Sequence, residues 1–484
     1  MKTKTTTYAL TALLLVTSLY ACGADGTAQS GGETTAAVDI PTEAVTTEPV
    51  LRENVPEEDM GGAVFSIMID EGTSGMDDFI AEEETGDLLN DAVYRRNSVI
   101  EERFNITLDA YINGYAGTFV KNLNTFISAG DSTVDVAMGM NNISTGITAL
   151  VYDGYFVDWN ELEYVDVTQP WWDENIIRDL SFGGKIYTMT GDFNPSTLGN
   201  TRILLFNKNM LSSLDMEYPY EKVLDGTWTY DVFAEMIKAG LSDVNGDGVY
   251  DADNDRWGYV GWQYDIGESV YIGLGGTYAT KDANNMPVLN LNTDRSIDIL
   301  DKMLALFADG AGAWQNAVEW GKDMTAFAEG RAMFANSRLY LLNNFRDMTD
   351  DFGIIPHPKY DVSQENYSQS VDAVCTLAYI PMTNEDLRAT SIILEAMAAE
   401  SWRSVMPTYY EVVLQTKYTR DDDSEAMIDI IKENRYYTLQ LDTFNFSTMT
   451  EMIKKGENNF ASTYAKKEKK VNQELEEIIA AYSD

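Results

Sequence analysis

The chain has 484 residues, more than one hydrophobic core usually serves, so two lobes are expected. The formal net charge of −44 argues against a nucleic-acid partner, and it would also repel the body of the protein from an anionic bilayer. The single histidine, His357, excludes a His-liganded zinc centre and leaves at most one imidazole base.

The first 22 residues have the features of an export signal. Two lysines precede an apolar run, residues 10–19, which is too short to span a bilayer permanently. The segment ends in Leu-Tyr-Ala-Cys, which resembles the lipobox of bacterial lipoproteins. The resemblance implies removal of residues 1–21 and a diacylglyceryl group on Cys22, the alternative being an ordinary signal peptide with a chance cysteine. With Cys22 acylated, Cys375 is left without a disulfide partner, and its apolar surroundings predict a buried thiol.

A tether and an alternation of strands and helices follow. Residues 22–58 lack aromatic side chains and are rich in Thr, Ala, Gly and Glu, so they cannot bury enough apolar surface to fold. From Ala63 on, apolar patterning predicts strands at 64–69, 106–112 and 134–138 and helices over 89–104 and 119–127. This alternation predicts βαβ units around a parallel sheet, and the fold class is α/β.

The remainder of the chain is predicted to be mostly helical. Strands are expected at 185–189 and 202–208, on either side of a loop at 191–201. Helices are expected at 230–240, 293–308, 322–336, 384–404 and 424–434. In the final segment Val471, Leu475, Ile478 and Tyr482 form one apolar stripe, which predicts an amphipathic helix packed onto the body.

Several short motifs, taken in order over roughly residues 60–445, resemble the extracellular solute-binding lipoproteins of ABC importers in the maltose-binding-like group. These motifs are Thr190-Gly191-Asp192 with Leu204-Leu205-Phe206-Asn207-Lys208, Phe327-Ala328-Glu329-Gly330-Arg331-Ala332-Met333, Phe352 to Lys359, Leu394 to Met397, and Pro407 to Glu411. The resemblance implies a two-lobed periplasmic-binding-protein-like fold with hinge crossings, a helical C-terminal region and a solute bound between the lobes.

The same resemblance implies a division of the chain. A signal at 1–21 and the tether at 22–58 precede the lobes. Residues 59–192 with about 321–372 are expected in lobe 1, about 200–320 with about 376–445 in lobe 2, and 446–484 in C-terminal helices.

A calcium-loop-like motif lies at residues 243–255. Side-chain oxygens at its first, third and fifth positions and a glycine at the sixth match the first half of an EF-hand loop, although Asn254 stands where an EF-hand carries Glu. We expect structural Ca²⁺ here, and an Asp/Asn/Gly-rich surface turn without metal is the alternative. The expected ligands are Asp243, Asn245, Asp247, the Val249 carbonyl, Asp251 and Asp255.

Solute contacts are expected from aromatic side chains, whose faces suit sugar rings, and from short polar side chains that bond hydroxyl groups. Trp262 is the preferred aromatic contact because it ends a strand-like segment. The other aromatic candidates, each with core packing as the alternative, are Trp171, Trp172, Trp314 and Trp320. The polar candidates are Asp192, Asn194, Asn141 and Asp372, with Tyr409 added by the resemblance.

The sequence as a whole predicts a binding protein without catalytic activity. It would capture a solute, expected to be a carbohydrate, as a monomer and deliver it to an ABC permease. The lipid on Cys22 would hold it at the extracellular face of the membrane, which favours a Gram-positive-type envelope. The alternatives are a surface-anchored calcium-containing carbohydrate-active enzyme, which needs two carboxylates at mechanistic separation, and a non-transport receptor or adhesion lipoprotein.

Overall fold

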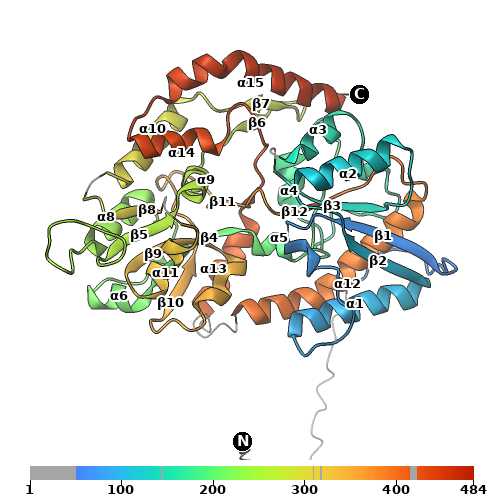
Figure 1. Cartoon of the computed structure of the whole chain (residues 1–484), viewed down its shortest axis with the longest axis horizontal. Coiled ribbons are helices and arrows are strands. Elements are labelled where there is room, and N and C mark those ends of the chain that lie inside the picture. The colour runs from blue at the N-terminus through green and yellow to red at the C-terminus, as the bar shows by residue number, and fades with distance from the viewer. Residues whose placement is uncertain are drawn as a thin grey trace, which may run out of the picture. The chain divides into compact units, whose positions relative to one another are not determined.

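The structure is a computed structural model that describes residues 51–72, 74–142, 145–308, 310–316, 319–414 and 422–483 (Figure 1). Cys22, the predicted signal and most of the predicted tether lie outside these residues. No helix within the described ranges combines the length and apolar character needed to cross a bilayer.

Lobe 1 is built on a four-stranded sheet in the order β12-β3-β1-β2. Strand β1 pairs in parallel with β2 and β3, and β12 runs antiparallel to β3. The strands span Ala63–Ile69 (β1), Ile106–Ile112 (β2), Val136–Met140 (β3) and Thr376–Tyr379 (β12). Around the sheet lie α1 (Leu88–Phe104), α2 (Gly117–Ser128), α3 (Ile147–Tyr152), α4 (Glu174–Leu180) and α12 (Leu387–Leu414). The α/β class and the early elements are therefore as predicted.

Helix α1 illustrates how local sequence sets these elements. The Asp87 carboxylate accepts hydrogen bonds from the first backbone amides of the helix, and Asn105 ends it in the left-handed conformation. Val93, Ile100 and Phe104 recur on one face and are fully buried, so that face anchors the helix to the lobe.

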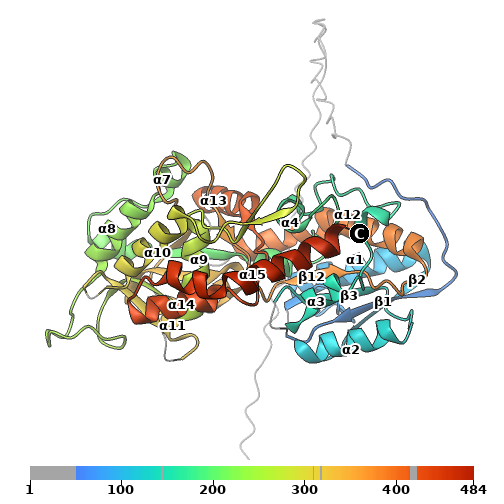
Figure 2. The same cartoon turned by 90° about the horizontal axis from the view of Figure 1, so that it is seen from above.

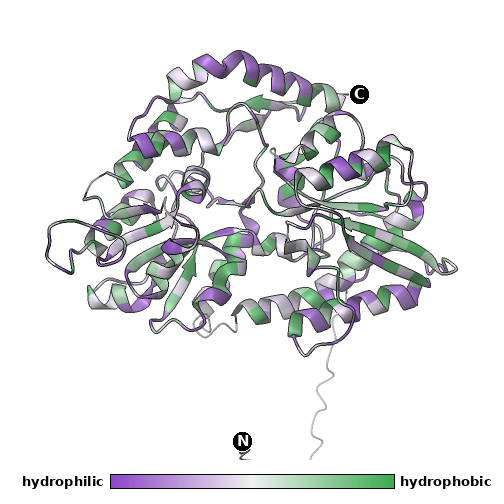
Figure 3. Ribbon diagram, in the orientation of Figure 1, coloured by the Kyte–Doolittle hydropathy of each residue, from purple (hydrophilic) through white to green (hydrophobic). Residues whose placement is uncertain are grey.

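Lobe 2 is built on a five-stranded mixed sheet in the order β10-β4-β9-β5-β8. Its strands are β4 (Arg202–Asn207), β5 (Trp257–Trp262), β8 (Ala313–Asn316), β9 (Ala332–Arg338) and β10 (Phe352–Ile355). Its helices include α6 (Lys208–Ser213), α7 (Tyr220–Leu224), α8 (Tyr230–Gly240), α9 (Gln263–Gly273), α10 (Asp294–Leu306), α11 (Lys322–Ala328) and α13 (Asp422–Glu433). The strands of both sheets are largely apolar (Figure 3), as the predicted core requires.

The predicted division into lobes is wrong for two segments. Residues 322–355 do not return to lobe 1, because β9 and β10 both pair with β4 in the second sheet. Residues 376–414 belong to lobe 1, because β12 pairs with β3 and α12 packs on α1. The predicted helix at 322–336 is confirmed over α11, Lys322–Ala328, and wrong beyond it: Gly330, with φ of +72°, follows α11, and a buried strand begins at Ala332. The predicted strand at 185–189 is replaced by isolated bridges.

Chain crossings connect the lobes. The first crossing contains the short helix α5 (Ser196–Gly199) and enters β4, and the second leads from β11 (Gln369–Ser370) to β12. Thr201 pairs with Val371, and the Asp372 amide donates to the Asn200 carbonyl, so the two crossings lie side by side. The third connection runs from α12 to α13 and then to β13 (Arg435–Tyr436), which pairs with β11.

The C-terminal helix α15 (Phe460–Ser483) provides a further link between the lobes. After α14 (Phe446–Lys455), which packs on α9, it contacts α10 of lobe 2, α3 of lobe 1 and the strand β7 (Pro287–Leu289) (Figures 1 and 2). Strand β7 forms a hairpin with β6 (Ala279–Lys281). The predicted amphipathic stripe is confirmed, since Val471, Ile478 and Tyr482 are buried.

Candidate functional site

Charged, aromatic and amide side chains lie together at one edge of the lobe 2 sheet. Arg202 begins β4 and pairs with Arg338, the last residue of the antiparallel strand β9. Trp262 ends β5 and pairs with Asn316, the last residue of the parallel strand β8. All four residues therefore lie at the carboxyl edge of β5, β8 and β9, where open α/β sheets bind their ligands.

Three aromatic side chains, which we call the aromatic edge, lie at this end of the sheet: Trp262, Tyr264 and Trp320. The Trp262 ring lies 5.8 Å from Tyr264 and 5.7 Å from Trp320, centroid to centroid, and meets Trp320 at 84°. Trp320 is 50% exposed and Tyr264 47% exposed. Two large rings this exposed offer flat apolar faces to a solute, and two of the predicted tryptophans are brought together here.

Behind the aromatic edge lies a buried group of charges, which we call the arginine–carboxylate network: Arg202, Arg338, Asp265, Glu268 and Asp372. Arg202 forms ion pairs with Asp265 at 3.0 Å, Glu268 at 2.9 Å and Asp372 at 3.3 Å. Arg338 pairs with Asp265 at 2.9 Å and also with Asp372. Its guanidinium carbon lies 5.4 Å from the centroid of the Trp320 ring, so the network supports the aromatic edge directly.

Burial and the arginines set the pKa values in this network. Burial alone would raise the pKa of Asp372, but Arg202 and Arg338 outweigh it and hold that pKa well below its usual range. Burial raises the pKa of Glu268 to about 7 even though Arg202 opposes the rise. Burial also lowers the pKa of His357 to about 4, so the one imidazole is neutral at pH 7. The predicted residue Asp372 thus lies in the second crossing as part of a charge network.

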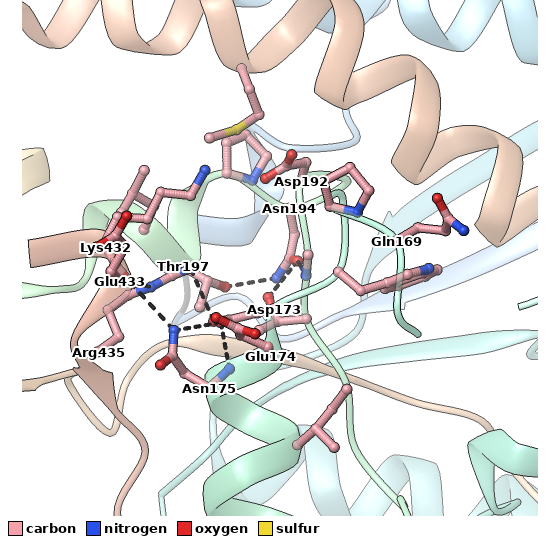
Figure 4. Close-up of a pocket in the computed structure, with 18 of the residues that line it drawn as sticks. Gln169, Asp173, Glu174, Asn175, Asp192, Asn194, Thr197, Lys432, Glu433 and Arg435 are labelled. Carbon is pink, nitrogen blue, oxygen red and sulfur yellow. Dashed lines mark hydrogen bonds and ion pairs between the residues drawn. The ribbon is translucent and has the colours of Figure 1, made fainter. Parts of the chain in front are cut away.

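A cavity of about 780 Å³, which we call the hinge cavity, lies beside the crossings. Figure 4 shows its two sides: Lys432 and Glu433 from the end of α13 and Arg435 from β13 face Asp192 and its neighbours from lobe 1 and the first crossing. The predicted residues Asp192, Asn194 and Trp172 line it, but no residue of the aromatic edge or the arginine–carboxylate network does. The predicted contacts therefore divide between two places.

Other predicted contacts are less accessible. Trp171 is fully buried, and its indole Nε1 donates a hydrogen bond to Glu395. The indole Nε1 of Trp172 donates to the same carboxylate, so both rings pack in the lobe 1 core. Trp314 is half-buried, with its ring 6.3 Å from Trp257. Asn141 is buried beyond β3, where its backbone amide donates to the Cys375 carbonyl.

Tyr409 is buried but lines a smaller cavity of about 270 Å³. Tyr340 on lobe 2, which is 40% exposed and lies just past Arg338, lines the same cavity together with Asp77 from the segment after β1. Sequence reasoning missed Tyr340, Arg202, Arg338, Asp265 and Glu268. The sequence offered one signal for the two arginines: Arg202 begins one largely apolar run and Arg338 ends another, and these runs become neighbouring strands.

Replacing Asp192 by Asn (Asp192→Asn) is expected to stabilise the protein at pH 8 by up to about 4 kcal/mol and much less at pH 5. Burial raises the pKa of Asp192 to about 7, while Lys432 and Arg435 oppose the rise. The folded state therefore binds this proton more tightly than the unfolded state, and wild-type stability falls as pH rises from about 4 to 7. Urea denaturation at the two pH values checks this, with Glu102→Gln, an exposed site on α1, as the control. An equal effect of Asp192→Asn at both pH values would contradict it.

The calcium-like loop is described in full, and its carboxylates mainly bond backbone amides of the loop. Asp243 accepts from Gly246 and Gly248, and Asp255 accepts from Val244 and Asp251. Within the described residues no group of three or more His, Cys, Asp or Glu side chains is placed to hold a metal ion. A calcium site here would need these carboxylates to turn from the amides toward one point, so calcium binding stays a prediction.

The fold can be compared with known proteins. No protein-family profile and no curated protein sequence matches the chain. Solved structures match at low identity. An ABC substrate-binding protein of Listeria monocytogenes in complex with cycloalternan is 13% identical, covering 86% of this chain and 99% of that one, with a TM-score of 0.53. The maltose/maltodextrin-binding domain of Bdellovibrio bacteriovorus bound to maltotriose is 15% identical, covering 86% and 100%, with a TM-score of 0.51.

A third solved structure carries a different solute. UgpB of Mycobacterium tuberculosis, in complex with glycerophosphocholine, is 13% identical, covering 87% of this chain and 99% of that one, with a TM-score of 0.55. This chain matches all three structures over nearly their whole length. It contains two α/β sheets, paired crossings and a helical C-terminal region. The protein therefore has the two-lobed fold of the maltodextrin-binding type of ABC solute-binding proteins.

Proposed function

We propose that the protein captures a small solute, a carbohydrate, at the aromatic edge and releases it without chemical change. The observation that carries this proposal is the group of exposed rings at the carboxyl edge of the lobe 2 sheet. Tryptophan and tyrosine faces pack well against the C–H faces of sugar rings, while their polar atoms stay available for hydroxyl groups. The two sugar complexes among the similar structures support this solute class.

Binding without catalysis fits the acids near the aromatic edge. A retaining or inverting glycosidase needs two free carboxyl groups, one of them an acid with a raised pKa. Asp265 and Asp372 are instead buried and paired with arginines, and Glu268 is bonded to Arg202 and is 3% exposed. These carboxylates serve to hold the arginines in place rather than to reach a solute.

We further propose that Cys22 carries a lipid that holds the protein at the extracellular face of the membrane, where an ABC permease receives the solute. The lipobox-like N-terminal sequence supports the lipid anchor. The likeness in fold to an ABC substrate-binding protein supports delivery of the solute to a permease. Mass spectrometry of the membrane-extracted protein should find diacylglyceryl on Cys22, and Cys22→Ala should release the protein from the membrane fraction. Unchanged membrane association of Cys22→Ala would argue against the anchor.

The solute class is tested by a thermal-shift screen of the chain lacking residues 1–22. The panel holds monosaccharides, malto-oligosaccharides, other oligosaccharides and glycerophosphocholine. A ligand at one hundred times its Kd should stabilise the folded state by about 2.7 kcal/mol, which raises the Tm by a few degrees. No shift with any sugar, together with a shift with glycerophosphocholine, would reassign the solute class.

Calcium is expected to bind the loop at residues 243–255 in about one equivalent and to raise the Tm, and EDTA should reverse the rise. Oxygen ligands at the first, third and fifth positions carry this expectation. Calorimetry of the wild type and of Asp247→Ala, which removes one expected ligand, checks it. The absence of both a calcium heat and an EDTA effect would leave the loop as a surface turn held by its own hydrogen bonds.

A further inference from the structure

The hinge cavity is not used by the proposed function, and its size and lining are those of a ligand site. Its volume of about 780 Å³ falls in the range of small-molecule pockets. Its walls come from residues 167–177 of lobe 1, from the first crossing and from the end of α13 with Arg435. Since no residue of the aromatic edge contributes, a ligand here is separate from the proposed carbohydrate.

Among the described residues that line this cavity, Asp192 has a buried carboxylate oxygen without a hydrogen-bond partner. The side chain is 8% exposed, and within the described residues its Oδ2 accepts no hydrogen bond. Both polar atoms of the neighbouring Asn194 side chain already have hydrogen-bond partners: its oxygen accepts from Thr190, and its nitrogen donates to Thr197 and to the Thr376 carbonyl. An unpartnered carboxylate oxygen buried in a lined cavity costs free energy that a hydrogen-bond donor on a ligand would recover.

The charges around the cavity favour a cation. Its lining holds five acidic and two basic side chains, a formal charge of −3. Arg435 is already paired with Asp173 at 3.0 Å, and Lys432 lies 5.4 Å from the centroid of the Tyr410 ring with no ion pair to Asp192 in the described part of the chain. Three of the acids, Glu174, Asp429 and Glu433, are exposed and give the cavity an acidic rim.

Apolar side chains complete the lining. Val167, Ile177, Leu198 and Met406 contribute hydrocarbon surface to the cavity, which Asp192 and the exposed acids also line. A chain of methylene groups packs favourably against such surface, whereas a ligand with hydroxyl groups on every carbon would leave them unpaired there. The lining therefore suits a ligand with charged ends and an apolar middle.

We propose that the hinge cavity is a second ligand site, which takes a small aliphatic diammonium or polyammonium ion. One primary ammonium donates to Asp192 Oδ2, the methylene chain lies against the apolar side chains, and the other ammonium meets the acidic rim. The site is independent of carbohydrate binding at the aromatic edge.

The test is isothermal titration of the chain lacking residues 1–22 with 1,4-diaminobutane, at pH 8 and 150 mM NaCl. The salt suppresses diffuse association of cations with a chain of formal charge −44. The expected result is one saturable site in the wild type, with Kd raised at least tenfold in Asp192→Asn and two- to threefold in Glu433→Gln at the exposed rim. Bis-quaternary decamethonium, which has no N–H donor, should bind at least tenfold more weakly than 1,4-diaminobutane.

Two controls separate this site from its surroundings. Glu102→Gln removes one exposed charge outside the cavity and should leave the titration unchanged. Trp262→Ala should weaken sugar binding and leave diamine binding unchanged. The proposed carbohydrate site and the proposed diamine site can therefore be tested, and can fail, independently. Equal diamine affinity of Asp192→Asn and Glu102→Gln, or no saturable heat in the wild type, would overturn the proposal.

Discussion

Replacing Arg338 by Met (Arg338→Met) is expected to lower the free energy of unfolding by about 3–5 kcal/mol. Arg338 pairs with Asp265 and Asp372, and all three side chains are about nine-tenths buried or more. Methionine fills much of the same space but leaves two buried carboxylates, for which Arg202 is the one remaining cationic partner among the described residues. Chemical denaturation at pH 8 measures the loss.

A matched control and a pH readout make this prediction specific. Arg95→Met removes an arginine whose partner is Glu84, and both side chains are roughly half exposed or more, so a change below about 1 kcal/mol is expected. Since Arg338 holds the pKa of Asp372 low, the loss in Arg338→Met should shrink as pH is lowered and Asp372 becomes protonated. Similar losses for Arg338→Met and Arg95→Met would show that the network does not stabilise the fold.

Replacing Trp262 by Ala (Trp262→Ala) is expected to weaken solute binding by about ten- to a hundredfold, or about 1.4–2.8 kcal/mol. Trp262 lies between Tyr264 and Trp320, so its removal both deletes one ring face and leaves Trp320 without its edge-to-face partner. Titration of the solute identified by the screen measures the change.

The control for Trp262→Ala is Tyr250→Ala. Tyr250 is also exposed and aromatic, but it lies in the loop at 243–255, where its ring contacts Trp257. Solute affinity of this variant should match that of the wild type. Equal affinity of Trp262→Ala and the wild type would place the solute away from the aromatic edge.

Local patterning predicted many of the elements. Helix α8 begins and ends at the predicted residues, because its apolar side chains recur at helical spacing, and α15 buries the predicted stripe. The predicted helix at 322–336 is correct over α11, but its second half was mispredicted because Ala and Met residues suit a helix. Pairing with β4 and β5 overrides that local preference and makes β9 a fully buried strand. Pairing partners far apart in sequence are not visible in local patterns, and the lobe assignment failed for the same reason.

The site was predicted in part. Trp262 and Trp320 were chosen singly, on grounds of residue type and position, and the structure brings their rings together across 57 intervening residues. Of the arginine–carboxylate network only Asp372 was chosen, as a solute contact; the other four members were missed because they are spread over residues 202–338 and each alone reads as an ordinary charge. For Trp171 the alternative of core packing fits the structure, and sequence could not decide it because the partner of its indole, Glu395, lies more than two hundred residues away.

Binding of an unchanged solute at the aromatic edge is tested by titration of the solute selected by the screen into the chain lacking residues 1–22, followed by mass spectrometry of the recovered solute. We expect one saturable site, an unchanged solute after prolonged incubation, and a loss of affinity in Trp262→Ala but not in Tyr250→Ala. Conversion of the solute to a product, or binding that does not depend on Trp262, would contradict it.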